Sequence, residues 1–257
     1  CVLPIHSKSC STNSHKYFIN GLLLTQSTSV SDLGVIVDSR LSFNQHISNI
    51  LTKASQRTGA FFRGVASRHL ALTKQVFVSY IRPLLEFNSN IWNPTKKYLI
   101  DKLENVQRRF TKRIPSISHL PYKDRLLALA LEPLELRRLH SDIIQYFKIM
   151  NNLTSIQPDK FFTLHYPPTS PRNPDPYLIK PSNFSTSLQS SFFYRYLDCW
   201  NTFPAVVEQS SSLPIFKRLL YLTLYILFTV PRQLVSFMFT CGSEHSASCF
   251  NLILLSS

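Results

Sequence analysis

The sequence predicts a mainly α protein: a helical bundle preceded by a short β-hairpin region and followed by a proline-rich loop and a further helical segment. Three observations lead to this prediction. From residue 44 onward the apolar residues recur with the period of a helix. Before that point they form short runs beside turn residues. Residues 157–183 contain seven prolines, which indicates an extended loop or linker without regular structure.

The first 43 residues have the pattern of short strands. In KYFINGLLL, residues 16–24, aromatic and apolar residues flank Asn20-Gly21, a dipeptide typical of tight hairpin turns. A second apolar run, SDLGVIVDS at residues 31–39, is closed by polar residues. The opening residues, CVLPI, have the pattern of a strand entered midway. We therefore expect the chain to be a fragment, with residues 1–43 as its β region.

Helical periodicity then defines a unit over residues 44–152. A first helix is expected over 44–63, and its apolar face contains Ile47, Leu51, Ala54, Thr58 and Phe61. A second is expected over 72–87, with a kink or break near Pro83. A third, over 95–114, has an apolar stripe of Leu99, Leu103, Val106 and Phe110 and ends at Pro115. Two more helices are expected, over 122–131 and 134–152.

Residues 153–220 are predicted to form the proline-rich linker and a last amphipathic helix over 190–201. Residues 221–257 are apolar without amphipathic patterning, so we expect an atypical tail with few contacts to the bundle. The apolar or hydroxyl run 219–230 has only twelve residues, whereas a membrane-spanning helix needs about 20. The sequence therefore argues against a membrane anchor.

Positive charge is concentrated in one part of the chain. The formal net charge is +14, and residues 53–148 contain 18 Lys and Arg against 7 Asp and Glu. The third predicted helix contains the densest group: Lys97, Lys102, Arg108, Arg109, Lys112 and Arg113. At 100° per residue, Lys97, Arg108 and Lys112 lie opposite the apolar stripe, and Arg109 lies on its flank. This group is either a solvated helix face or a surface that binds phosphates without sequence preference. The regional surplus and the neighbouring aromatic residues favour nucleic acid.

Catalytic and metal-binding patterns are missing from the sequence. It has no phosphate-binding glycine loop, no G-x-S-x-G, no H-E-x-x-H and no cluster of carboxylates for two-metal phosphoryl chemistry. We therefore predict no catalytic residues, no metal site, no cofactor and no small-molecule substrate. The five cysteines form no C-x2-C pair, and the N-terminus has no signal-peptide pattern. Both features favour reduced thiols inside the cell, in the nucleus or the cytoplasm.

Five stretches of the chain, in this order and spacing, resemble the C-terminal part of non-LTR, LINE-type retrotransposon reverse transcriptases of the jockey and related clades. They are VSDLGVIVDSRLSFNQHISNILTKA, VFVSYIRPLLEFNSNIWNP, IDKLENVQRRFTKRI, PYKDRLLALALEPLELRRLHSDIIQYFKIMNN and FFYRYLDCWNTFPAVV. The resemblance covers about residues 1–220 and fades after Lys217-Arg218-Leu219-Leu220. The tail at 221–257 looks like the product of a frame slip or of read-through into non-coding sequence.

The resemblance implies a role for each segment. Residues 1–43 would be the end of the palm, with Leu33, Gly34 and Val35 in a primer-grip-like hairpin. Residues 44–152 would be the thumb-like helical bundle that holds an RNA/DNA duplex, and 153–220 a C-terminal extension. The aspartate-containing polymerase motif, which would use Mg²⁺ in the full-length enzyme, would lie in the upstream palm and fingers of the same polyprotein. Two other interpretations remain open: a helical adaptor whose basic face meets acidic protein or lipid, and a non-functional relic of a mobile element.

Overall fold

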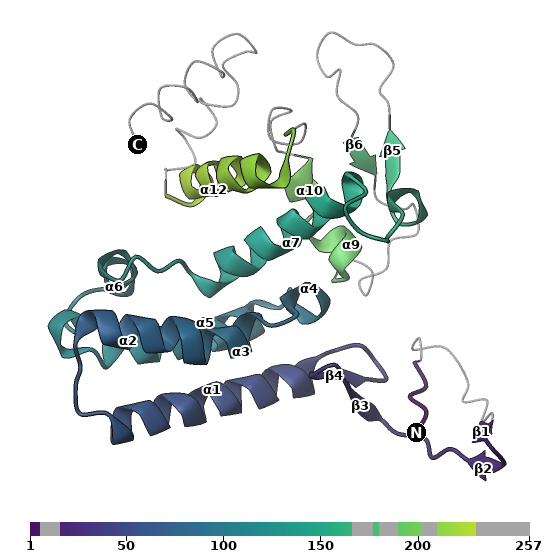
Figure 1. Cartoon of the computed structure of the whole chain (residues 1–257), viewed down its shortest axis with the longest axis horizontal. Helices are drawn as coiled ribbons and strands as arrows, with labels where there is room; N and C mark the ends of the chain where they lie inside the picture. The colour runs from purple at the N-terminus through teal and green to yellow at the C-terminus, as the bar shows by residue number, and fades with distance from the viewer. Residues whose placement is uncertain (6–15, 166–176, 180–189, 202–209, 230–257) are drawn as a thin grey trace, which may run out of the picture.

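The computed structural model confirms a mainly helical protein with β-hairpins near its N-terminus (Figure 1). It describes residues 1–5, 16–165, 177–179, 190–201 and 210–229. The remaining residues, which include most of the predicted tail, lie outside the described part of the chain. Among the described residues, no helix is both long and apolar enough to cross a membrane.

Two antiparallel hairpins precede the first helix. Strands β1 (Phe18–Ile19) and β2 (Leu22–Leu23) are joined by Asn20 and Gly21, whose φ angles of 51° and 77° are those of the predicted tight turn. Strands β3 (Ser29–Asp32) and β4 (Val35–Asp38) pair Val30 with Val37 across a second two-residue turn. That turn consists of Leu33 and Gly34, with φ angles of 45° and 86°.

The carboxylate of Asp38 connects the second hairpin to the helical bundle. It accepts backbone N–H groups of Arg40, Ser42 and Phe43 at 2.9–3.1 Å, and the Ser42 hydroxyl at 2.8 Å. Burial alone would raise the pKa of Asp38, but these hydrogen bonds outweigh burial and lower it. The chain is thereby directed from β4 into the first helix, α1 (Asn44–Gly64).

A first hydrophobic core is formed by Val35 of β4, by α1 and by the segments that follow α1 as far as Leu134. These segments are α2 (Leu70–Val76), the π-helix η1 (Phe77–Ile81), α3 (Arg82–Glu86), α4 (Ser89–Trp92), α5 (Lys97–Lys112), the 3-10 turn η2 (Pro115–Ile117) and α6 (Tyr122–Ala128). Phe110 of α5 lies at the centre of this core. Its ring centroid is 6.1, 5.1 and 4.9 Å from those of Phe61, Phe62 and Phe77.

The break expected within residues 72–87 is a widened turn. The chain passes from α2 through η1 into α3 without leaving a helical path, and η1 directly precedes Arg82-Pro83. Proline has no N–H to donate to the preceding turn, and wide π-turns are one way in which a helix accommodates such a defect. Arg57 of α1 donates to the Tyr80 carbonyl at 2.6 Å, within the widened segment.

A second core forms around the helix α7 (Leu134–Met150). It is completed by residues of strand β6 (Tyr177–Ile179) and of helices α9 (Phe192–Arg195), α10 (Leu197–Trp200) and α12 (Leu213–Thr229). The 3-10 turn η3 (Pro158–Lys160) and strand β5 (Thr163–His165) lie before and after Phe162, which is also part of this core. Leu134 belongs to the first core, whereas Leu136 and the buried residues after it belong to the second. The division between the cores therefore falls inside the predicted 44–152 unit, at the start of α7.

Two expectations for the C-terminal half are wrong. Residues 157–183 do contain regular structure, because β5 and β6 form an antiparallel pair over three proline-free residues each. The side chain of Asn201 accepts the backbone N–H of Leu178 in β6 and donates to its carbonyl. The single helix expected over 190–201 is interrupted at Tyr196, where φ is −121°. Of the predicted tail at 221–257, the structure describes residues 221–229, which continue α12 as far as Thr229, and Thr223 among them is 1% exposed; residues 230–257 lie outside the described part of the chain.

A buried histidine supports the contact between the second hairpin and α1. His46 is 2% exposed, and its Nδ1 accepts the backbone N–H of Ile36 in β4 at 3.2 Å. Its ring also lies 5.2 Å from that of Trp92. A protonated imidazole has two N–H donors and cannot accept this bond. The native packing at this position therefore requires neutral His46.

We predict that the fold loses stability as the pH falls below about 6.5, the ordinary pKa of histidine in an unfolded chain. Burial first, and the positive charge of Lys53 second, lower the pKa of His46 in the folded protein. The unfolded chain then binds more protons than the folded one, so the stabilisation is present above this pH and lost below it. Urea unfolding at pH 7.5 and 5.5 measures the loss. His46→Gln should reduce the difference, and an unchanged difference would contradict this explanation.

Candidate nucleic-acid interface

Helix α5 has the two faces that the sequence predicts. All four stripe residues, Leu99, Leu103, Val106 and Phe110, are at most 8% exposed. The six predicted cations, from Lys97 to Arg113, are all exposed. The amphipathic pattern therefore identified correctly which side of the helix meets the core.

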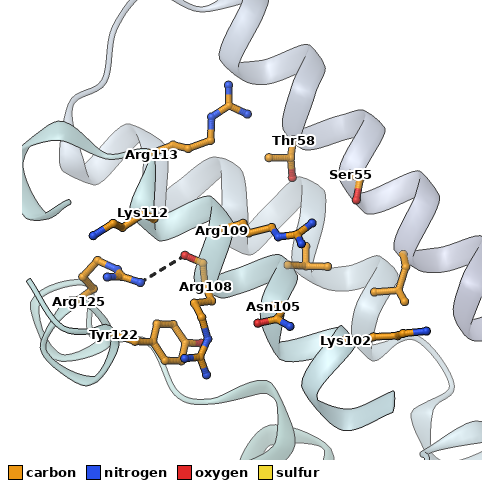
Figure 2. Close-up of a pocket in the computed structure, with 12 residues that line it drawn as sticks. Ser55, Thr58, Lys102, Asn105, Arg108, Arg109, Lys112, Arg113, Tyr122 and Arg125 are labelled. Carbon is orange, nitrogen blue, oxygen red and sulfur yellow. Dashed lines mark hydrogen bonds between the residues drawn. The ribbon is translucent and has the colours of Figure 1, made fainter. Parts of the chain in front are cut away.

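A groove of about 920 Å³ runs along the exposed face of α5 (Figure 2). One wall is α1, which contributes Leu51, Ser55 and Thr58, and the other is α6, which contributes Tyr122 and Arg125. The floor is α5 and the residue after it: Lys102, Asn105, Val106, Arg108, Arg109, Lys112 and Arg113. Six of these twelve lining residues are Lys or Arg, and none is Asp or Glu. The surface of the groove is therefore positively charged, and no lining carboxylate neutralises it.

The predicted site residues do not all gather in this groove. Lys102, Arg108, Arg109, Lys112 and Arg113 line it, but Lys97 does not. The Lys97 ammonium lies 3.4 Å from the Asp101 carboxylate and 3.9 Å from that of Glu135. Lys97 is therefore neutralised by acidic neighbours one turn before the groove begins.

The primer-grip-like residues lie at the tip of the β3–β4 hairpin and are not among those that line the groove. Leu33 is 84% exposed, whereas Val35 is 2% exposed and belongs to the first core. An added Cβ at Gly34 would lie 3.4 Å from the Phe87 ring, so the hairpin tip approaches the end of α3. Leu33 and Gly34 thus form the turn itself, and Val35 begins β4 with its side chain in the first core.

The cations on the groove floor form two rows. Lys102 and Arg109 are seven residues apart, close to two full turns, and lie on the side of α5 that faces α1. Arg108 and Lys112 are four residues apart and face α6 (Figure 2). The side chain of Asn105 lies between the rows.

Tyr122 fixes the wall on the α6 side, and no pattern in the sequence pointed to this residue. Its hydroxyl donates to the Glu104 carboxylate and accepts the Gln107 amide N–H at 3.1 Å. The other carboxylate oxygen of Glu104 accepts the backbone N–H of Leu134 at 2.9 Å. Burial, followed by the negative charge of Glu104, raises the pKa of Tyr122 well above its usual value. The phenol therefore stays protonated and keeps donating this hydrogen bond.

Arg125 is a second groove residue that sequence reasoning missed. It is 4% exposed and donates to the Thr111 hydroxyl at 3.1 Å and to the carbonyls of Leu120 and Arg108 at 2.7 and 3.4 Å. These bonds attach α6 to α5 and add a fixed positive charge to the wall. Only its spacing from Tyr122, three residues on a short helix, hinted that the two side chains share a face.

No group of three or more metal-ligating side chains occurs among the described residues. Comparison with known proteins adds little about function. No protein-family model matches the chain, and no solved structure matches it. A Caenorhabditis elegans protein named "Uncharacterized protein B0403.1" is 27% identical over 129 residues, which is 49% of this chain and 63% of that protein. The chain thus matches less than two thirds of the length of this relative.

Proposed function

We propose that the chain binds the backbone of an RNA/DNA duplex without sequence preference, as the thumb-like and C-terminal part of a LINE-type retrotransposon reverse transcriptase. The observation that carries this proposal is the groove beside α5, which has six cationic and no acidic lining residues. Phosphate contacts by Lys and Arg position a protein on a duplex but do not read its sequence. The five stretches that resemble the reverse transcriptases support the assignment to this family.

In this proposal the chain binds but does not catalyse. The polymerase aspartates and their Mg²⁺ would belong to upstream palm and fingers of the same polyprotein, which would be its protein partner inside the cell, in the nucleus or cytoplasm. The two rows of cations, one facing α1 and one facing α6, would contact phosphates along the duplex. The role of this chain would be to hold the template–primer in place.

The competing function is a helical adaptor whose basic surface meets acidic protein or lipid. An even ring of charge around the helix would favour that adaptor. In α5 the unpaired cations instead line one groove, and Lys97, outside it, is paired with carboxylates. Concentration of positive charge in a concave surface focuses the field on a polyanion that can enter it.

A salt titration with a labelled RNA–DNA duplex of about 20 base pairs tests the proposal. If about four phosphates are neutralised, the slope of log K against log salt should be near −3.6, the value for a DNA duplex. Two duplexes of unrelated sequence should bind equally. Binding to anionic vesicles in preference to both duplexes would support the adaptor instead, and a slope near zero would contradict backbone binding.

A further inference from the structure

Two exposed arginines of the groove lie against aromatic rings on opposite sides of α5. The guanidinium carbon of Arg108 is 4.5 Å from the centroid of the Tyr122 ring, on the α6 side. That of Arg113 is 4.1 Å from the centroid of Phe62, on the α1 side. In the described part of the chain, neither guanidinium makes a side-chain hydrogen bond or an ion pair with a carboxylate. A guanidinium stacked on a ring keeps its N–H edge available to a ligand.

Both rings are fixed by contacts of their own. Tyr122 is held at its hydroxyl by Glu104 and Gln107. Phe62 is 7% exposed and packs against Phe61 and Phe110 at centroid distances of 5.0 and 5.1 Å. Because the rings cannot move freely, the guanidinium groups on them lose rotamer freedom before any ligand arrives.

The other groove cations are held differently. The guanidinium carbon of Arg125 is 5.4 Å from the centroid of Tyr122, but Arg125 is buried and its N–H groups are used by Thr111, Leu120 and Arg108. Arg109, between the two stacked arginines in sequence, has no ring contact, hydrogen bond or ion pair among the described residues. The Lys112 ammonium donates a hydrogen bond to the Ser118 carbonyl at 2.7 Å. Lys102 lies 5.6 Å from the Tyr98 ring, farther than either stacked arginine lies from its own. Figure 2 shows Arg108 beside Tyr122 and Arg113 extending toward α1, with Arg109 between them.

We propose that Arg108 and Arg113 form two pre-organised phosphodiester sites, with Tyr122 and Phe62 as the residues that position them. This inference rests on the proposed nucleic-acid binding and adds which cations determine its affinity. An arginine fork can bind two oxygens of one phosphate with parallel N–H groups, whereas lysine acts as a point charge. A pre-ordered side chain also loses less conformational entropy on binding. Arg109, by contrast, contributes charge without a fixed geometry.

Arg-to-Lys substitutions at the three positions separate geometry from charge. R108K and R113K should each weaken duplex binding by about 5- to 10-fold, because stacking and the bidentate fork are lost. R109K is the matched control on the same helix and should change affinity by less than about 2-fold. The salt slope should stay unchanged in all three, since each variant keeps its charge. Equal losses in all three variants would overturn the inference.

Variants of Tyr122 test whether the ring acts through Arg108. Tyr122→Leu removes the aromatic face and should weaken binding about as much as R108K, and the double variant should bind no more weakly than either single one. Tyr122→Phe keeps the ring and should retain affinity within about 2-fold, even if the lost hydroxyl lowers the melting temperature. Additive losses in the double variant would contradict positioning. If the parent shows no salt-dependent binding, the proposed function itself fails. If it binds but Arg108, Arg109 and Arg113 behave alike, only the pre-organised sites fail.

Discussion

Replacing Arg108 and Lys112 together with Ala should weaken binding to every duplex sequence and flatten the salt dependence by roughly two units. Both side chains are exposed on the groove floor, so their loss removes charge and leaves the core intact. For about four phosphates, raising salt from about 50 to 200 mM should lower the affinity of the parent about 150-fold. With two cations removed, the same change should lower it only about 12-fold.

Two controls show whether this effect comes from groove charge. Lys97→Ala also removes a cation from α5, but Lys97 is paired with Asp101 and Glu135 outside the groove, so the slope should not change. Phe110→Ala should leave the charge intact and destabilise the fold by about 3–5 kcal/mol, because its ring is 0% exposed among other aromatic rings. If the double variant binds as tightly as the parent with the same slope, the cations are only a solvated face.

Replacing Asp142 with Ala should destabilise the protein by about 3–5 kcal/mol. Arg195 of α9 donates its Nε and Nη2 to the two Asp142 oxygens at 3.0 and 2.9 Å, and the two side chains are 1% and 0% exposed. The amides of Asn90 and Asn93 donate to the same carboxylate at 2.9 and 3.0 Å. Loss of the carboxylate would remove the counter-charge of a buried guanidinium and one hydrogen-bond acceptor of each of the two amides.

Urea unfolding of the Asp142→Ala variant measures this effect, with an exposed ion pair as the matched control. Asp101→Ala breaks the contact between Asp101 and Lys97, whose side chains are 54% and 72% exposed, respectively. This variant should lose less than about 1 kcal/mol of unfolding free energy. If both variants lose the same small amount of stability, the Asp142–Arg195 pair does not hold α7 and α9 to α4. A large loss for Asp142→Ala alone would show that this buried network of Asp142, Arg195, Asn90 and Asn93 stabilises the fold.

The helix positions were predictable because periodicity is a local property of the chain. The sequence placed helices at 44–63, 95–114 and 134–152, and the structure has them at Asn44–Gly64, Lys97–Lys112 and Leu134–Met150. The short C-terminal elements were not predictable in the same way. Strands β5 and β6 have three residues each and are separated by proline-rich sequence, so no alternation was long enough to identify them.

The sequence by itself determined the mainly α fold, the apolar stripe of α5 and the exposed position of its cations, since the spacing along one helix settles each of them. The tertiary structure alone decided which cations are available. It pairs Lys97 with carboxylates, places Arg108 and Arg113 on aromatic rings, and brings Tyr122 and the buried Arg125 to the same groove. It also joins Asp142 to Arg195, 53 residues later in the chain. Such contacts depend on how helices distant in sequence pack together, which residue spacing within any one helix does not specify.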